Sequence, residues 1–359
     1  MKKIVTILGA RPQFVKAAVL SRIIAKYNEV KEVIIHTGQH YDANMSDIFF
    51  DEMEIPKPKY NLAINGMSHG AMTGQMLIEI EAVLMKENPD LVVVYGDTNS
   101  TLAGTLAAKK MNIKVVHVEA GLRSFNMKMP EEINRILTDR ISDLLLCPTD
   151  TAIENLQKEG FTNLPAKMVK CGDIMKDAVE YYSKISEEKS SIISRLKLIP
   201  NDFVLATIHR QENTDDLEKL QEIFDGLQLI CNEKQVVLPL HPRTKAILTQ
   251  HQLNYGIQII DPVGYFDMLE LLKKCNLVIT DSGGLQKEAF FNKKHCIIAR
   301  EETEWVELVA NGFAKIVGSD KEKMLQSFHN YQDSTANFEM DLFGENVGEK
   351  IYEEIIKML

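Results

Sequence analysis

The sequence lacks the features that mark membrane, secreted and nucleic-acid-binding proteins. It has no run of about 18 apolar residues, so we expect no membrane-spanning helix. Its first residues, MKKIVTILGARPQF, combine a short apolar run with no small-residue cleavage site, which is not the pattern of a signal peptide. The formal net charge of −10 argues against nonspecific binding to nucleic acid, although a local basic site could still hold a phosphate.

Cysteine is scarce, and its spacing excludes the common metal motifs. The five cysteines show no C-x-x-C spacing, and neither they nor the nine histidines have the spacing of metal ligands. Their odd number and mostly apolar neighbours favour reduced thiols and a cytoplasmic protein. We therefore expect no metal. The cysteines are Cys147, Cys171, Cys231, Cys275 and Cys296.

What the sequence does contain is a regular alternation of short apolar runs and amphipathic segments. The chain has 359 residues, of which 45% are hydrophobic, enough for two domains with separate cores. The alternation is typical of a parallel sheet covered by helices on both faces. Because the pattern restarts near residue 169, we predict an α/β protein of two doubly wound, Rossmann-like domains, residues 1–168 and 169–343. Two such domains would leave a cleft facing the carboxyl ends of both sheets, where ligands bind in open α/β folds.

The expected elements follow from this pattern. Strands are predicted at 3–8, 33–36, 91–95, 114–118, 144–147, 203–207, 236–240, 257–260, 277–279 and 295–299. The helices predicted with definite bounds are 13–27, 44–53, 72–86, 101–111, 130–141, 151–159 and 344–359.

The stretch LVITDSGGLQKE resembles an anion-binding turn. A buried strand, residues 277–279, ends in Asp281, Ser282, Gly283 and Gly284, and a helical pattern follows. The first-turn N–H groups of a helix lack internal partners, the helix dipole adds partial positive charge, and glycine lets a phosphate approach the backbone. The alternative is a tight turn that binds no ligand.

Two carboxylates follow successive strands of the first domain. Asp97 comes just after the strand LVVVY, and Glu119 directly after KVVHV. Burying two carboxylates that have no function would cost free energy, so their presence at these strand ends favours a catalytic role. The alternative is that each caps the helix that follows it.

A third acid, Glu131, lies next to Glu132 in the first turn of a helix that begins at Pro130. The helix dipole alone favours acids at this place, so a structural role stays open. Arg123 and Arg135 are near enough in sequence to be partners of these acids.

Cationic side chains follow strands in both domains. Arg11 and Lys16 come after the first strand, in a turn that suits a phosphate or carboxylate but is not G-x-G-x-x-G, so the dinucleotide fingerprint is absent. His209 ends one strand of the second domain and is followed by Arg210.

His241 ends the next strand in the same way and is followed by Arg243, and Arg300 follows a further strand. Histidines in these places can bind phosphate or transfer protons, although a lone histidine is more often structural. The acids thus gather in the first domain and the phosphate-binding groups in the second. This arrangement suits a nucleotide that is bound by the second domain while its attached group faces the carboxylates of the first.

Several longer segments resemble one known family, the non-hydrolysing UDP-N-acetylglucosamine 2-epimerases. They occur in the order typical of that family and cover nearly the whole chain. The segments are GARPQFVKAA, HTGQHYD, YGDTNSTLAG, HVEAGLRS, MPEEINR, HRQEN, HPRT, DSGGLQKEA and AREETEWVE.

The resemblance implies a GT-B fold, in which the C-terminal helix at 344–359 crosses back onto the first domain. It also implies a homodimer that needs no metal and no nicotinamide cofactor, and a role in supplying sugar nucleotides for cell-surface polysaccharide. By motif, the catalytic residues would be Asp97, Glu119, Glu131 and His209. The positions similar to the UDP and substrate site are Arg11, Lys16, Gln39, His241, Arg243, Ser282, Gly283, Gly284, Glu288 and Arg300.

Two segments depart from the commonest form of the family. Many members have G-T-R-P-E where this chain has GARPQ at residues 9–13, and residues 124–129, SFNMKM, also differ. Both features are similar to the branch that acts on UDP-2,3-diacetamido-2,3-dideoxyglucuronic acid, an O-antigen precursor. Gln75 lies near where some relatives carry an arginine for a second, activating UDP-GlcNAc.

The chemistry implied is inversion at C2 by elimination of UDP and its re-addition. Such a site needs a base on one face of the sugar, an acid on the other, and support for the leaving diphosphate. We assign the proton transfers to Asp97, Glu119 and Glu131 collectively. The alternatives are a GT-B glycosyltransferase, a hydrolysing 2-epimerase and a UDP-sugar sensor without catalytic activity.

Overall fold

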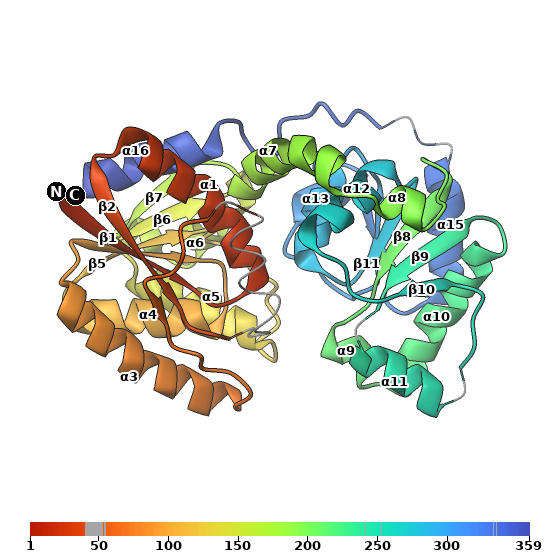
Figure 1. Ribbon diagram of the computed structural model, residues 1–359, viewed down its shortest axis with the longest axis horizontal. Helices are drawn as coiled ribbons and strands as arrows, with labels where there is room; N and C mark the ends of the chain where they lie inside the picture. Colours follow the sequence, from red (N-terminus) through yellow and green to blue (C-terminus); the bar gives the residue numbers. More distant parts are fainter. Residues whose placement is uncertain (40–52, 54, 241, 252, 333, 335) are drawn as a thin grey trace. The chain divides into compact units, whose positions relative to one another are not determined.

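The computed structural model describes residues 1–359 except 40–52, 54, 241, 252, 333 and 335, and describes only the backbone of Pro242 and Arg243. The chain forms two compact units, drawn in Figure 1. Unit 1 comprises Met1–Ala178 and Asp341–Leu359, and unit 2 comprises Val179–Met340. The expected helix at 44–53 falls almost wholly outside the described residues.

Unit 1 is built on a parallel sheet with the strand order β3-β2-β1-β4-β5-β6-β7. Its central strands are apolar and buried, which explains why they were predictable from their sequence. The strands are β1 (Lys2–Leu8), β2 (Val30–His36), β3 (Tyr60–Asn61), β4 (Leu91–Tyr95), β5 (Lys114–Val118), β6 (Leu144–Cys147) and β7 (Lys167–Lys170).

Helices cover both faces of this sheet (Figure 1). One core cluster joins alternate residues of β1, β2 and β4 to the apolar faces of α3 and α4. The helix α16 packs against α1, and the Asp177 carboxylate accepts hydrogen bonds from the first backbone amides of α16. The helices are α1 (Arg11–Tyr27), α3 (His69–Glu87), α4 (Asn99–Lys110), α5 (Pro130–Ile141), α6 (Asp150–Lys158), the short 3-10 helix η1 (Phe161–Asn163), α7 (Ile174–Lys189), which continues into unit 2, and α16 (Val347–Met358).

Unit 2 repeats the plan with the strand order β10-β9-β8-β11-β12-β13, again all parallel. Its core joins β8, β9 and β11 to the apolar faces of α10 and α15. The strands are β8 (Phe203–Thr207), β9 (Gln235–Pro239), β10 (Gln258–Ile260), β11 (Leu277–Thr280), β12 (Cys296–Ile298) and β13 (Ala314–Ile316). The helices are α8 (Ile192–Arg195), α9 (Gln211–Thr214), α10 (Leu217–Cys231), α11 (Pro242–Gln250), α12 (Tyr265–Lys274), α13 (Gly283–Phe291), α14 (Val306–Ala310) and α15 (Lys321–Gln332).

The strand order places one topological switch point in each unit. Both sheets follow the Rossmann order 3-2-1-4-5-6, to which unit 1 adds β7 at one edge. The direction of winding therefore reverses between β1 and β4 in unit 1 and between β8 and β11 in unit 2. Ligands of open α/β sheets bind beside the carboxyl ends of such strand pairs. The predicted α/β class with two doubly wound sheets is therefore confirmed, and four strand ends become the places to examine.

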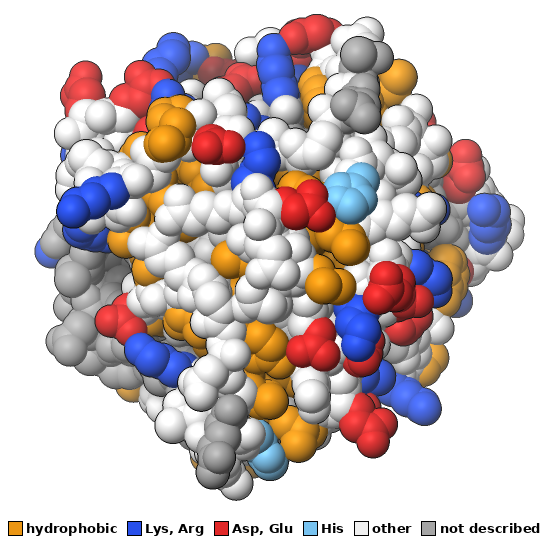
Figure 2. Space-filling view, turned by 90° about the vertical axis from the view of Figure 1, so that its right-hand side faces the viewer, with side chains coloured by type: hydrophobic (Ala, Val, Ile, Leu, Met, Phe, Trp, Pro, Cys, Tyr) orange, Lys and Arg blue, Asp and Glu red, His pale blue; other side chains and the backbone are white. Residues whose placement is uncertain are grey.

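Within the described residues, no helix is long and apolar enough to cross a membrane. All five cysteines are free thiols. Acidic and basic side chains are interspersed over the face drawn in Figure 2, and no extended basic area appears among the side chains described there.

Candidate active site

The turn after β1 is tied to the turn after β4 by one buried side chain, Gln13. Its Oε1 accepts hydrogen bonds from the amides of Gly9 and Ala10, at 2.7 and 3.0 Å. Its amide nitrogen donates to the Tyr95 carbonyl at 2.7 Å and to the Thr98 hydroxyl at 2.9 Å. A glutamate here would lack the donor that reaches the Tyr95 carbonyl.

Asp97 lies just past β4 and is held by an arginine. Its Oδ2 accepts a hydrogen bond from Arg135 Nη2 at 2.6 Å, and its side chain is 31% exposed. Arg135 also pairs with the buried Glu132 at 2.7 Å. The N-cap of α4 is Thr98, so the alternative reading of Asp97 as a helix cap is wrong.

Glu119 lies at the end of β5, with a backbone φ of 72° that non-glycine residues rarely adopt. Its carboxylate forms a buried ion pair with Lys16, and the two side chains are 10% and 7% exposed. Backbone strain of this kind tends to occur at functional sites, where surrounding structure holds it in place. Gly96 lies against this pair, since a Cβ on Gly96 would come within 3.3 Å of Glu119 Oε2.

The other unit 1 positions that the sequence singled out lie in α5, at the start of α1 and in the segment after β2. Glu131 is partly exposed in the first turn of α5, and Arg11 is the first residue of α1. Gln39 accepts hydrogen bonds from the amide and hydroxyl of Ser100 in the first turn of α4, at 3.1 and 2.9 Å. Of the two arginines expected beside the acids, Arg135 contacts Asp97.

The second of those arginines, Arg123, belongs to a separate network that is buried except for Glu159. It pairs with Asp139 at 2.7 Å and with Glu159 through two hydrogen bonds of 2.7 and 2.8 Å. His117 contacts Asp139 on the other side, at 2.7 Å between Nδ1 and Oδ1. Sequence reasoning did not single out His117 or Asp139, although a histidine within the apolar strand KVVHV is costly to bury without partners.

In unit 2, the ends of β8 and β11 meet through Asp281, which is fully buried. Its carboxylate accepts hydrogen bonds from the backbone amides of His209 and Arg210, both at 3.0 Å, and from the Asn213 side chain at 3.1 Å. Burial alone would raise the pKa of Asp281, but the hydrogen bond with His209 and the backbone amides lower it below its ordinary value.

His209 is oriented by this carboxylate. Its Nδ1 lies 3.1 Å from Asp281 Oδ1, while the side chain as a whole is 53% exposed. This contact fixes the ring through Nδ1 and leaves Nε2 for other partners. Asp281 was expected only as part of a turn, so its role in orienting His209 was missed.

The turn after β11 begins α13 as the sequence predicted. Ser282 is the N-cap residue, and Ser282, Gly283 and Gly284 are partly exposed. Glu288 lies further along the same helix and is buried. The partly exposed first turn therefore offers backbone amides and the positive end of the helix dipole to an anion.

Arg300 is buried beside this first turn and is already paired with a carboxylate. Its two terminal nitrogens lie 3.1 and 3.2 Å from the carboxylate oxygens of Glu304. A Cβ on Gly283 would come within 3.4 Å of Glu304 and 3.9 Å of Arg300. His241 lies outside the described residues, and of Arg243 only the backbone is described, at the start of α11.

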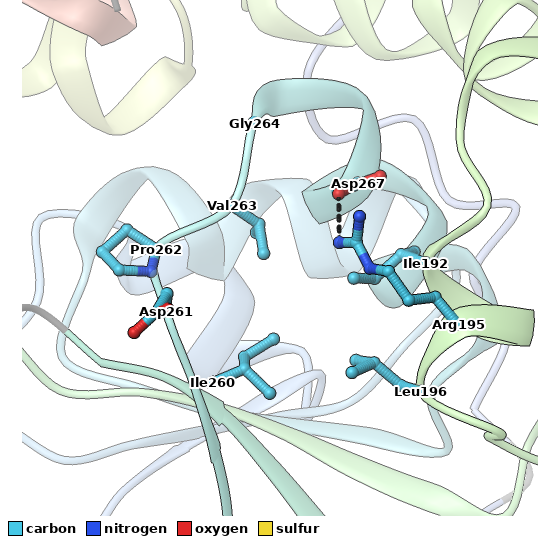
Figure 3. A pocket seen from close by; sticks show the side chains of 9 residues that line it. All are labelled: Ile192, Arg195, Leu196, Ile260, Asp261, Pro262, Val263, Gly264 and Asp267. Atoms are coloured by element: carbon cyan, nitrogen blue, oxygen red, sulfur yellow. Dashed lines mark hydrogen bonds and ion pairs between the residues drawn. The ribbon is translucent and has the colours of Figure 1, made fainter.

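A pocket of about 420 Å³ lies elsewhere in unit 2, after the edge strand β10 (Figure 3). Ile260, Leu196 and Val263 line its apolar part, and an ion pair of 2.9 Å between Arg195 and Asp267 borders it. None of the predicted site residues lines this pocket. Among the described residues, no group of three or more His, Cys, Asp or Glu side chains could hold a metal ion.

Comparison with known proteins decides the family. The model of the family described as UDP-N-acetylglucosamine 2-epimerase matches residues 22–356. The chain belongs to this family. The predicted family and enzyme class, an isomerase acting as a UDP-sugar 2-epimerase, are confirmed.

Relatives of this 2-epimerase family member are similar along its whole length. The UDP-2,3-diacetamido-2,3-dideoxy-D-glucuronate 2-epimerase of Pseudomonas aeruginosa is 51% identical to this chain. The aligned region covers 95% of this chain and 96% of the P. aeruginosa protein. The crystal structure of the Methanocaldococcus jannaschii UDP-GlcNAc 2-epimerase in complex with UDP-GlcNAc and UDP has a TM-score of 0.92 and 43% identity, covering 99% and 100% of the two chains.

The Neisseria meningitidis UDP-GlcNAc 2-epimerase bound to UDP-GlcNAc has a TM-score of 0.89 and 31% identity, covering 99% and 100%. These likenesses confirm the GT-B-like fold that the resemblance implied.

Proposed function

We propose that this family member is a non-hydrolysing 2-epimerase of UDP-N-acetylhexosamines that inverts C2 by eliminating and re-adding UDP. The observation that carries the proposal is the placement of Asp97 and Glu119. Each carboxylate lies at a strand end, and each is held by a buried cation, Arg135 or Lys16. Their strands, β4 and β5, are neighbours in the sheet, and β4 borders the switch point of unit 1.

The reaction needs this combination because the C2 hydrogen of an N-acetylhexosamine is not adjacent to a ring carbonyl. Direct deprotonation is therefore unfavourable. In elimination, the C2–H bond breaks as the C1–O bond breaks, which gives UDP and a 2-acetamidoglucal-type alkene. UDP then adds back at C1 as a proton reaches the opposite face of C2. We assign the two proton transfers to Asp97, Glu119 and Glu131 collectively.

The leaving diphosphate would be held by the cations and amides that follow the strands. His209, oriented by Asp281, and the first-turn amides of α13 support this part of the proposal. Arg11, Lys16, Gln39, Glu288 and Arg300, together with His241 and Arg243, complete the proposed substrate-binding residues. Loss of one such contact typically removes about 2.7–4 kcal/mol of transition-state stabilisation.

For the substrate, we propose UDP-2,3-diacetamido-2,3-dideoxy-D-glucuronate. The 51% identity to the P. aeruginosa enzyme of that name supports this choice, as does the departure of residues 124–129 from the plain UDP-GlcNAc form. The product would supply cell-surface polysaccharide.

We further propose a cytoplasmic homodimer. The free cysteines support the location, and the family resemblance supports the dimer. A light-scattering mass of a monomer at assay concentration would contradict the dimer.

The test is turnover of the two candidate substrates in parallel, UDP-GlcNAc and the diacetamido-uronate, with the C2 epimer resolved by NMR. We expect a kcat/KM at least about 100-fold higher for the uronate. Equal or reversed preference would contradict the substrate assignment but leave the reaction class intact. Stoichiometric free UDP and free sugar would instead identify a hydrolysing enzyme, and turnover only with an added acceptor would identify a glycosyltransferase.

A further inference from the structure

His117 is a buried histidine whose two ring nitrogens both face hydrogen-bond acceptors. It lies in β5, two residues before Glu119, and its side chain is fully buried. Nδ1 is 2.7 Å from Asp139 Oδ1 on α5, and Nε2 is 2.7 Å from the carbonyl oxygen of Gly96. A carbonyl oxygen and an ionised carboxylate only accept hydrogen bonds, so each is a partner for a ring N–H of His117.

The surroundings of Asp139 support its ionised form. Burial would raise the pKa of Asp139, but the hydrogen bond with His117 and the charge of Arg123 lower it. Arg123 pairs in turn with Glu159 at the surface, so the carboxylate of Asp139 is held between a buried guanidinium and the His117 ring. Such a network is stable only when every member is hydrogen-bonded, as each is here.

The network reaches both turns that carry the proposed catalytic carboxylates. Through Nε2, His117 holds the carbonyl of Gly96, the residue directly before Asp97. Through Asp139, whose Oδ2 accepts from the Gly121 amide at 3.1 Å, it holds the turn that follows Glu119. Gly96 and Glu119 both have left-handed backbone angles, φ 60° and 72°, which these contacts keep in place.

We propose that His117 is a positioning residue for the epimerisation, which holds the turn of Asp97 in place through its hydrogen bond to the Gly96 carbonyl. The assignment rests on the proposed function, because it presumes that Asp97 and Glu119 act on the sugar. The ring is fully buried, so it acts through its neighbours and not on the sugar itself. It acts by fixing the place of Gly96, which lies against the Glu119 carboxylate, so a shift of this turn would displace both acids. Displacement of a reacting group by about 1 Å can cost about 100-fold in rate.

Two matched substitutions separate the two hydrogen bonds of the ring. In His117→Gln, the amide nitrogen can take the place of Nε2 and still donate to Gly96, while the bond to Asp139 is lost. In His117→Asn, the shorter amide can take the place of Nδ1 and donate to Asp139, while Gly96 is released. Glu159→Gln serves as a control, because it weakens the same network away from both carboxylates.

The measurement is kcat and KM of all four proteins for whichever UDP-sugar the wild type epimerises, with thermal unfolding of each. We expect His117→Asn to lower kcat by about 10- to 100-fold with KM changed less than about threefold. His117→Gln should stay within about fivefold of the wild-type kcat, and Glu159→Gln should lower the unfolding temperature without lowering kcat.

Equal kcat values for the glutamine and asparagine variants would overturn the assignment, as would an unchanged kcat with a raised KM. If the asparagine variant does not fold, the glutamine variant decides alone, and a fall of tenfold or more in its kcat overturns the proposal. A wild type that epimerises no UDP-sugar would instead overturn the proposed function, and the positioning role with it.

Discussion

The substitution Glu119→Gln probes catalysis and stability together, because Glu119 forms a buried ion pair with Lys16. The two side chains are 10% and 7% exposed, so little water screens the charge that remains on Lys16. Removing one partner of a buried pair costs about 3–5 kcal/mol. Since the glutamine oxygen can still accept a hydrogen bond from Lys16, we expect the lower end, about 3 kcal/mol.

In a unit of this size, that loss would lower the unfolding temperature by about 6–12 °C, measurable by calorimetry. Loss of a proton-transfer group should lower kcat by about 100- to 10,000-fold. UDP binding, measured by isothermal titration, should persist, because the proposed diphosphate contacts of unit 2 are unchanged.

The double variant Lys16→Met, Glu119→Gln separates the two effects. Replacing a buried pair by neutral groups is often neutral or stabilising, so the unfolding temperature should recover. Turnover should stay low. Recovery of turnover together with stability would show that the single variant failed through instability, and wild-type turnover in Glu119→Gln would remove Glu119 from the mechanism.

Three further predictions concern two of the turns and the C-terminal end of α3. Gln13→Glu removes the donor to the Tyr95 carbonyl and should destabilise unit 1 by about 1–3 kcal/mol, seen as a lower unfolding temperature; an unchanged temperature would refute the role of this amide. Asp281→Asn presents an amide to backbone donors, so it should release His209 and lower kcat, and a wild-type kcat would contradict the orienting role. Hydrogen bonds from Lys59 and Tyr60 lower the pKa of Glu87 from 4.5 to about 2. A lowered pKa adds stability that is present above pH 4.5 and lost as the pH falls toward 2, so Glu87→Gln should flatten the acid limb of a denaturation curve of unit 1 between these values.

The strand ends were predictable because an apolar run that stops at a polar residue marks them directly. Asp97, Glu119, His209 and the turn at Ser282 follow such runs, and the structure has a strand ending just before each. The rules for parallel sheets then indicate which end of each strand carries ligands.

Two of the partners could not be predicted, since each lies far away in sequence: Lys16 is 103 residues from Glu119, and Asp281 is 72 from His209. Arg135, by contrast, was expected beside the acids, and it contacts Asp97 and Glu132. The first two contacts depend on strand order, which a single sequence does not specify. Knowledge that β8 and β11 are neighbours would have placed Asp281 beside His209.

Three strands were missed for a local reason. They are short edge strands, β3 with two residues, YN, β7 with four, KMVK, and β13 with three, AKI, and the last two mix lysine with apolar positions. Edge strands need less apolar surface and often carry charge, so their pattern is weak. The first unit also extends to Ala178, past the change of pattern near residue 169, because α7 begins in unit 1 and ends in unit 2.

The central claim is that C2 is inverted through loss and return of its proton. Its most direct test is solvent exchange: the protein is incubated with one UDP-sugar in deuterium oxide, without any acceptor, and C2 is followed by NMR. The account predicts that deuterium enters C2 of the epimer while the UDP-sugar total stays constant. An epimer that keeps its original hydrogen at C2, or no exchange with either candidate substrate, would contradict the account.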